Sequence, residues 1–261
     1  MNIKKLLYIS IAVLFMFFGC EQDLDVTNPN QPTPDNYWNN QSEVEQTLTA
    51  SYSMLQLPLW GRWGVSEVFW PVQNYLSDGL IIRDDRQAWI DIHTFTAKPG
   101  NFTTTHYYHY CYKGVFFANQ VLANVEGVED ITDKEEQEIK SEARTLRAYY
   151  YYNLVNYYRN VPLITEVIDN KNEFYPEQAS PEEVWAQIEE DLNYAKDNLD
   201  YSKDWPGEFT KGTALALLGK AHMQQLDFSA ASSAFESIIN SEQYELVDEY
   251  ASLFTGTNEN S

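Results

Sequence analysis

Apolar residues recur every three or four positions through much of the chain, which is the spacing that gathers them on one face of a helix. The clearest case begins at Ser180-Pro181, where a serine N-cap, a first-turn proline and Glu183 at the third position form a capping box. The apolar positions that follow keep the helical spacing: Val184, Ile188, Leu192, Ala195 and Leu199. We therefore predict a helix from Pro181 that is buried along this stripe.

Two more capping boxes are predicted nearer the N-terminus. Ser42 with Glu45 precedes an apolar pattern that continues at helical spacing until Pro58. Thr132 with Glu135 marks the start of a second and longer helix. These signals predict that helices dominate the fold.

The chain between these two capping boxes has an irregular part followed by a helical part. Residues 58–105 mix Trp, Gly, Thr and Asp without a sustained period, so we predict long loops with short strands. A regular helical pattern resumes near Tyr107 and runs to about Val125. Three tryptophans of the irregular part are expected to pin its loops to the helices: Trp60, Trp63 and Trp70.

The predicted long helix contains six tyrosines within residues 142–164. On a helical wheel Tyr150 and Tyr157 fall on the same stripe as Leu146, while Tyr152 points nearly opposite and the other three lie on the flanks. A helix that is aromatic almost all round is packed on several sides, so we interpret the tyrosines as buried scaffold and not as a ligand platform.

Two arginines of the same helix, Arg144 and Arg147, lie one turn apart. We expect them to pair with carboxylates of neighbouring helices, because a charge on a buried face requires a partner.

The last third of the chain resembles a tetratricopeptide hairpin. Six residues fit the pattern W-x2-L-G-x2-Y…A-x3-F: Leu215, Leu218, Gly219, His222, Ala231 and Phe235. Gly219 permits close approach to Ala231 and Phe235, and Asp227 is placed to cap the second helix. With the capped helices before it, this unit predicts an all-α fold of tetratricopeptide-like hairpins with long irregular loops.

The chain begins with a targeting segment. Lys4 and Lys5 precede the apolar run Leu6–Phe18, which is too short to cross a bilayer comfortably, and Cys20 follows Gly19. A cysteine after a small residue resembles the lipobox of bacterial lipoproteins. We therefore predict a signal peptide at 1–19 and lipidation of Cys20; an ordinary secretory signal with a chance cysteine is the alternative.

The predicted mature chain has two parts, a polar, proline-containing tether at 20–41 and a helical body at 42–261. Once Cys20 carries lipid, Cys111 has no intramolecular partner, since the chain has two cysteines. Stability is therefore expected from a hydrophobic core and not from disulfides.

The chain is strongly acidic. Removal of Lys4 and Lys5 reduces the basic residues from 17 to 15 against 39 acidic ones, a formal charge of −24. Such a charge repels phosphate backbones, which argues against nucleic acid as a partner and favours an uncharged ligand over an anionic one.

Several segments, taken in order, resemble one family. They are Cys20 with its flanks, LDVTNPNQPTPDNYW (24–38), FFANQVL (116–122), EARTLRAYYYYNLVNYYRNVPLI (142–164), SPEEVWAQIEEDL (180–192) and the stretch 210–254. Together they are similar to the SusD/RagB family of Bacteroidetes outer-membrane lipoproteins, and specifically to the N-terminal half of its members.

This resemblance implies a function. Family members are lipid-anchored to the outer membrane, face the cell exterior and sit over a TonB-dependent transporter of the SusC type. They bind a glycan, or in some branches a peptide, and deliver it without chemistry or cofactor. Glu21 and Asp23 resemble the signal that directs such lipoproteins to the outer face.

The sequence departs from the family pattern in two places. Arg159 stands where the family usually has a helix-ending glycine, so we expect Asn160 to take the left-handed conformation instead. The family's C-terminal half, which normally contributes ligand contacts, has no counterpart after the segment ASLFTGTNENS.

The candidate ligand residues are Arg83, Asp84, Trp89 and Asn101. Sugars need an aromatic plane for the apolar ring face and polar groups for hydroxyl pairs, so Trp89 is the expected platform and the other three are expected to bond hydroxyls. The competing interpretation makes Arg83 and Asp85 a surface ion pair and Trp89 a loop anchor.

Other chemistry has weaker support. His106, His109 and Cys111 match no closed zinc set, so no metal site is predicted. No G-x-S-x-G, H-E-x-x-H or P-loop motif occurs, and no enzyme is predicted. A helical glycoside hydrolase, which needs only a carboxylate pair, and a protein-binding helical scaffold remain the alternatives.

Overall fold

The computed structural model describes residues 37–56, 70–82, 85–203, 205 and 207–254. The predicted signal peptide, Cys20, Trp60 and Trp63 lie outside this part, as does the tether up to residue 36. The described residues from Trp38 onward belong to one compact unit.

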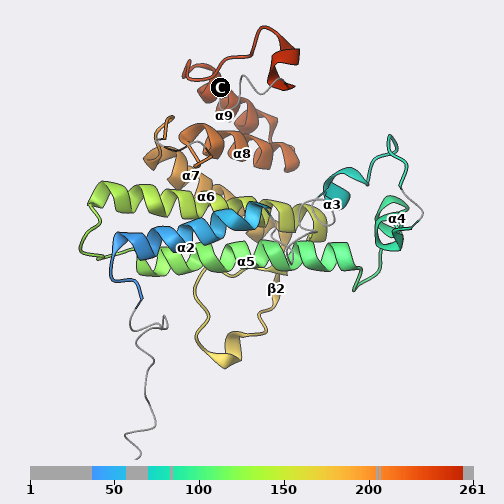
Figure 1. Cartoon of the computed structure of the whole chain (residues 1–261), viewed down its shortest axis with the longest axis horizontal. Coiled ribbons are helices and arrows are strands. Elements are labelled where there is room, and N and C mark those ends of the chain that lie inside the picture. The colour runs from blue at the N-terminus through green and yellow to red at the C-terminus, as the bar shows by residue number, and fades with distance from the viewer. Residues whose placement is uncertain (1–36, 57–69, 83–84, 204, 206, 255–261) are drawn as a thin grey trace, which may run out of the picture. The chain divides into compact units, whose positions relative to one another are not determined.

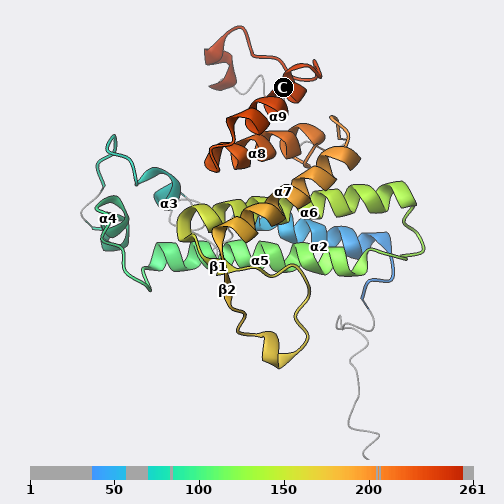
Figure 2. The ribbon, with the colours of Figure 1, turned by 180° about the vertical axis from the view of Figure 1, so that it is seen from behind.

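Helices form most of the described chain, so the all-α prediction is confirmed (Figures 1 and 2). The elements, with η for 3-10 helices, are α2 (Gln41–Ser53), η1 (Met54–Gln56), α3 (Trp70–Asn74), α4 (Gln87–His93), α5 (Phe102–Asn124), α6 (Asp133–Tyr158), β1 (Val161–Pro162), η3 (Lys171–Glu173), β2 (Gln178–Ala179), α7 (Pro181–Asn198), α8 (Lys211–Gln224), α9 (Phe228–Ile239) and η4 (Tyr250–Phe254). In the described residues, none of these helices combines the length and the apolar character that crossing a membrane requires.

Two of the predicted capping boxes are confirmed. The backbone N–H groups of Thr132 and Ser180 each donate to a glutamate side chain three residues on, Glu135 and Glu183, at 2.8 Å. The Thr132 and Ser180 hydroxyls donate to the same carboxylates at 2.6 and 2.8 Å. The hydroxyl and backbone hydrogen bonds together lower the pKa of both carboxyl groups, which keeps them ionised at the positive end of the helix dipole.

The prediction of a third capping box, at Ser42 and Glu45, is wrong. Helix α2 is capped by Asn40, whose side chain accepts from the Glu43 N–H at 3.1 Å, so Ser42 lies inside the first turn. Asparagine is at least as good an N-cap as serine, and at this position it starts the helix two residues earlier.

The prediction of short strands within residues 58–105 is also wrong for the described part. This part contains the short helices α3 and α4, which bury Val72 and Ile92 at 3% and 4% exposure. Trp89 and Ile92 are spaced by three residues, a helical interval that was too short to stand out in the sequence.

Helix α6 is the centre of the packing. It lies beside α5 and α2 (Figures 1 and 2), and α7 packs along it as well. Helices α7, α8 and α9 then pack each on the one before. The residue that the wheel placed opposite the core stripe, Tyr152, meets α7 through an edge-to-face contact with Trp185 at 5.7 Å between ring centroids.

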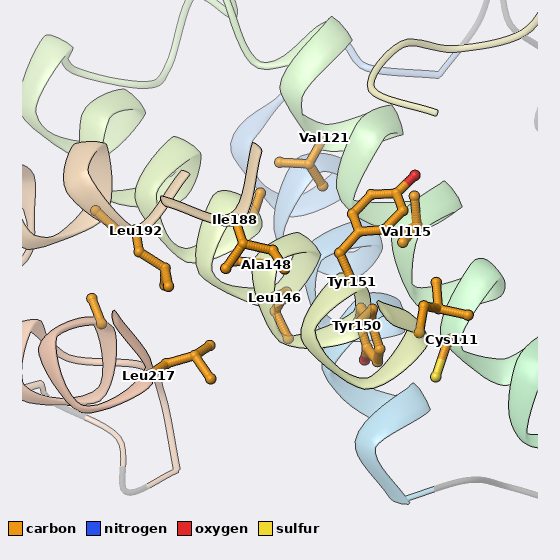
Figure 3. Packing of buried hydrophobic residues seen from close by; sticks show 14 of the residues in the cluster. Cys111, Val115, Val121, Leu146, Ala148, Tyr150, Tyr151, Ile188, Leu192 and Leu217 are labelled. Atoms are coloured by element: carbon orange, nitrogen blue, oxygen red, sulfur yellow. The ribbon is translucent and has the colours of Figure 1, made fainter. Parts of the chain in front are cut away.

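The tyrosines of α6 pack in or against the core, as predicted, although only two of the six are fully buried. Tyr150 and Tyr151 are 2% and 0% exposed, and Figure 3 shows both among apolar residues of the core. The Tyr150 hydroxyl donates to the Ser51 carbonyl at 2.5 Å, and the Tyr151 hydroxyl donates to the Ile164 carbonyl at 2.9 Å. Each ring therefore buries a large apolar area while its hydroxyl stays hydrogen-bonded.

The tetratricopeptide-like hairpin is formed by α8 and α9. A Cβ added at Gly219 would lie 2.6 Å from the Phe235 ring, so glycine is required where the two helices cross. Asp227 caps α9 by accepting from the Ala230 N–H at 3.0 Å. Both features match the prediction.

Helix α6 ends differently from the prediction. Arg159 itself takes the positive φ of 61°, and Asn160 does not. The chain leaves α6 at once for β1, where Val161 pairs with Ala179 of β2 in an antiparallel ladder. The positive φ that ends the helix therefore lies one residue earlier than predicted.

A buried ion pair joins α6 to α7. Arg147 donates from Nε and Nη2 to the two carboxylate oxygens of Asp191 at 2.8 and 2.7 Å, and the Asp191 side chain is fully buried. Arg144 donates to the same carboxylate at 3.0 Å. The prediction that both arginines pair with a carboxylate of a neighbouring helix is confirmed.

We expect Asp191→Ala to lower the free energy of unfolding by about 3–5 kcal/mol, because Arg147 is left charged and buried without its carboxylate. Replacing both partners, Arg147→Met with Asp191→Leu, should cost much less, since the remaining Arg144 is 25% exposed and keeps Glu190 within 3.6 Å. Urea unfolding measures both.

Asp197→Ala is the matched control on the same helix. The Asp197 side chain is 68% exposed in its pair with Lys196, so its loss should change stability by less than about 0.5 kcal/mol. An Asp191→Ala effect as small as this would contradict the importance of the buried pair.

Candidate functional site

Two of the four predicted ligand residues, Trp89 and Asn101, lie within the described part of the chain, near the start of α5. Trp89 lies in α4, and Asn101 directly precedes α5. Arg83 and Asp84 lie outside the described residues, so their ligand role stays a prediction. The side chain of Trp70, the third tryptophan expected to pin a loop, is not described either.

The Trp89 ring is half-buried and held by two neighbours. Tyr75 meets it edge-on with ring centroids 5.5 Å apart, and the Arg86 guanidinium carbon lies 5.1 Å from its centroid. Trp89 thus anchors α4 to the chain after α3, as the competing interpretation expects. A sugar ring that stacks on the face beneath Arg86 has to displace this guanidinium.

Asn101 uses its side chain within the protein. Its Oδ1 accepts from the Thr103 and Thr104 N–H groups at 3.0 and 3.3 Å, which caps α5. Its Nδ2 donates to the Ala88 carbonyl of α4 at 2.9 Å. Asn101 therefore fixes α4 against the start of α5, and a hydrogen bond from it to ligand remains a prediction.

A small apolar hollow of about 220 Å³ lies beside these residues. Its walls come from α3, α4, the start of α5 and the end of α6, and include Val72, Leu76, Ile92, Phe95, Tyr157 and Tyr158. Phe95 is 76% exposed and Leu76 is 41% exposed, so the hollow is bordered by apolar groups that face water. Such a surface suits the apolar face of a ligand.

Sequence reasoning did not assign these wall residues to the site. The wheel placed Tyr157 on the core stripe correctly, and its ring contacts Tyr107 edge-on at 5.5 Å. The helix ends one residue later, however, so the same side chain also reaches the surface. The sequence signal that could have indicated these wall residues was the predicted end of this helix, where core aromatic residues come to the surface.

Two of the three residues considered for zinc, Cys111 and His106, lie in different surroundings. Cys111 is 3% exposed, and burial raises the pKa of its thiol, which keeps it protonated and a poor metal ligand. His106 Nδ1 lies 2.7 Å from the Phe102 carbonyl oxygen. Within the described ranges, no group of three or more His, Cys, Asp or Glu side chains is arranged to hold a metal ion.

The fold defines a helical protein built on tetratricopeptide-like hairpins, with irregular connections between the helices. Residues 24–223 match the SusD-like family, whose description is "starch-binding associating with outer membrane". This match covers well over half of the chain, so the chain belongs to the SusD-like family.

Curated relatives come from Formosa agariphila. SusD-like protein P25 is 24% identical over 277 residues, which cover 99% of this chain and 50% of the relative. SusD-like protein P2 is 25% identical over 252 residues, 92% of this chain and 47% of the relative. The chain therefore spans about half the length of the curated relatives it matches.

Solved structures agree on the fold. A laminarin-binding SusD-like protein superposes with a TM-score of 0.74 at 32% identity, covering 85% of this chain and 49% of that protein. Surface glycan-binding protein A from Bacteroides thetaiotaomicron, solved with laminarihexaose, has a TM-score of 0.72 at 24% identity and covers 85% of this chain and 48% of its own.

We expect Asn101→Ala to lower the free energy of unfolding by about 1 kcal/mol, because α5 loses its N-cap acceptor. Asn101→Ser keeps an acceptor for the cap and should recover most of this loss. Urea unfolding checks the stability. An Ala variant as stable as the wild type would contradict the capping role, and a Ser variant that is stable but binds glycan weakly would support a ligand contact.

Proposed function

We propose that this protein binds a glycan at the cell surface and delivers it, chemically unchanged, to a TonB-dependent outer-membrane transporter of the SusC type. The observation that carries the proposal is the 32% identity and 0.74 TM-score with a laminarin-binding SusD-like protein over 85% of this chain. The tetratricopeptide-like scaffold supports a role in binding, because such hairpins offer a rigid surface and stable contacts to partners.

The α3–α4 surface supports the choice of an oligosaccharide. Trp89 provides an indole, the neighbouring apolar hollow is bordered by the exposed ring of Phe95, and Arg86 adds a donor beside the indole. Sugars present apolar ring faces and hydroxyl edges, which aromatic and charged side chains bind together. The formal charge of −22 for the whole chain disfavours polyanionic ligands.

The proposed location is the outer face of the outer membrane, with a lipid on Cys20 as the anchor. The apolar run Leu6–Phe18 and the Gly19-Cys20 pair support export and lipidation, and the family description supports the outer membrane. Residues 21–36, which include three prolines, suit a tether between the anchor and the helical body.

We expect Trp89→Ala to weaken binding to the cognate glycan about tenfold, because the sugar loses a stacking surface worth roughly 1 kcal/mol or more. Calorimetric titration against a panel that includes laminarin measures the loss. Tyr175→Ala is the matched control. This ring is 92% exposed but belongs to the loop between β1 and β2 and not to α3 or α4, so its removal should leave affinity unchanged.

Equal affinity of the Trp89→Ala variant and the wild type would remove Trp89 from the site. Chromatography of the same mixtures tests delivery without chemistry, since an altered oligosaccharide profile would favour the glycoside hydrolase alternative. Co-purification with a large β-barrel transporter separates the proposal from a general protein-binding scaffold.

We expect Cys20→Ser to abolish lipidation, since serine has no thiol to acylate. In cell fractionation the wild type should be found in the outer membrane, labelled by a clickable fatty acid, and accessible to added protease. The variant should lose the fatty-acid label and leave the membrane fraction. A labelled or firmly membrane-bound variant would contradict anchoring through this residue.

A further inference from the structure

A second and larger hollow lies far from Trp89. Its volume is about 890 Å³, and it is formed by α2 with η1, the first half of α6 and residues that follow α7, among them Lys203 and Trp205. Its wall on α6 includes Glu138, whereas the apolar hollow reaches Tyr158 at the other end of the same helix. At 1.5 Å per residue, these two positions are about 30 Å apart.

The floor of the large hollow is a hydrogen-bonded chain of polar side chains. The Glu142 side chain, 7% exposed, accepts from the Lys203 Nζ at 2.8 Å and from the Tyr52 hydroxyl at 2.6 Å. Lys203 Nζ also lies 3.3 Å from the Glu138 carboxylate. The floor thus holds fixed acceptors and a fixed donor next to open space.

The side chains of this floor are held in place by contacts within the protein. The Tyr52 hydroxyl accepts from the Phe209 N–H at 2.8 Å, and the Tyr52 ring meets that of Phe209 edge-on with centroids 5.1 Å apart. Burial and the charge of Glu142 raise the pKa of Tyr52, so its hydroxyl stays protonated. Burial lowers the pKa of Lys203, but the hydrogen bond and charges of Glu142 and Glu138 outweigh it, and the net pKa is raised.

The walls combine apolar and polar groups. Leu48, Leu55 and Ile139 present aliphatic surface, while Gln41, Thr49 and Gln56 add amide and hydroxyl groups. Trp205, also in the wall, is 73% exposed. An indole with this much water contact at the edge of a hollow is an available stacking surface.

Charge narrows the possible occupant. Six carboxylates and two lysines line the hollow: Glu45, Glu135, Glu138, Glu142, Asp200 and Glu208, with Lys134 and Lys203. The excess of negative charge opposes an anionic ligand, and so many charged groups oppose an apolar peptide helix. The volume is within the range of about 300–1,000 Å³ that small-molecule sites occupy.

We propose that this hollow is a second carbohydrate-binding site, specific for uncharged oligosaccharides, with Trp205 as the stacking surface and the Glu142–Lys203 floor bonding hydroxyl groups. The inference rests on the proposed function for the class of ligand but uses none of the residues around Trp89. The two sites border opposite ends of the rigid helix α6, so together they can hold one long glycan, or two shorter ones, at separated points.

The test is ¹⁹F NMR on the full chain labelled with 5-fluorotryptophan. The signals of Trp205 and Trp89 are assigned from the Trp205→Phe and Trp89→Phe variants, among the seven tryptophans of the sequence. The probes are laminarihexaose and maltohexaose, both uncharged, and hexagalacturonate, which is anionic. We expect the Trp205 signal to move with an uncharged probe, and hexagalacturonate to require at least about tenfold higher concentration.

The two signals report separately. If only the Trp205 signal moves, the second site is supported and the proposed site at Trp89 is contradicted. If only the Trp89 signal moves, the site at Trp89 is supported and the second site is contradicted. A Trp205 signal that stays still with both uncharged hexasaccharides up to 10 mM, roughly the weak limit of a specific sugar site, overturns this inference. So does equal binding of hexagalacturonate.

A blocking variant tests the hollow itself. Thr49 lines the hollow from an exposed position of α2, so the added ring of Thr49→Tyr should obstruct it and weaken the Trp205 response at least tenfold while leaving that of Trp89 unchanged. Gln46→Tyr is the matched control, because Gln46 is exposed on the same helix but does not line the hollow. An unchanged Trp205 response in Thr49→Tyr places the contact elsewhere and overturns the proposal.

Discussion

The alignment of the helices around α6 depends on the buried pair of Arg147 and Asp191. Removing two charges from water is unfavourable, so the pair is tolerated only where every hydrogen bond is made. Besides its two bonds to Asp191, Arg147 donates from Nη1 to Asn119 Oδ1 and to the Thr165 carbonyl, both at 2.9 Å. One guanidinium therefore fixes α5, α6, α7 and the segment after β1, and any other alignment of these helices would leave a charge buried alone.

With α6 fixed along its length, its two ends form different surfaces. The C-terminal end, with Tyr157 and Tyr158, borders an apolar hollow, and the N-terminal half, with Glu138 and Glu142, borders a polar one. The proposed ligand groups lie beside these surfaces, Trp89 in the short helix α4 and Trp205 in the segment between α7 and α8. A binding loop carries little rigidity of its own, so a packed helix beneath it is what holds both surfaces in place.

The sequence predicted what is decided locally and missed what is decided at a distance. The capping boxes of α6 and α7 need only four consecutive residues, so they were recognised. That Arg147 seeks a carboxylate followed from its burial, but the choice of Asp191, 44 residues away, depends on how helices pack. The positive φ of Arg159, two residues before the β1–β2 pairing begins, and the contacts of Trp89 with Arg86 and Tyr75 were likewise visible only in the folded chain.

The use of tyrosine in place of phenylalanine in the core links distant segments of the chain. Four buried or half-buried hydroxyls donate to backbone carbonyls of other elements: Tyr112 to Pro162, Tyr150 to Ser51, Tyr151 to Ile164 and Tyr158 to Thr104. A hydroxyl left without a partner in the interior costs about 1–3 kcal/mol, so each buried ring needs such an acceptor. The rings thus fill the core while their hydroxyls join α2, α5 and the β1 segment to their neighbours, and these contacts account for the aromatic pattern of α6 as packing.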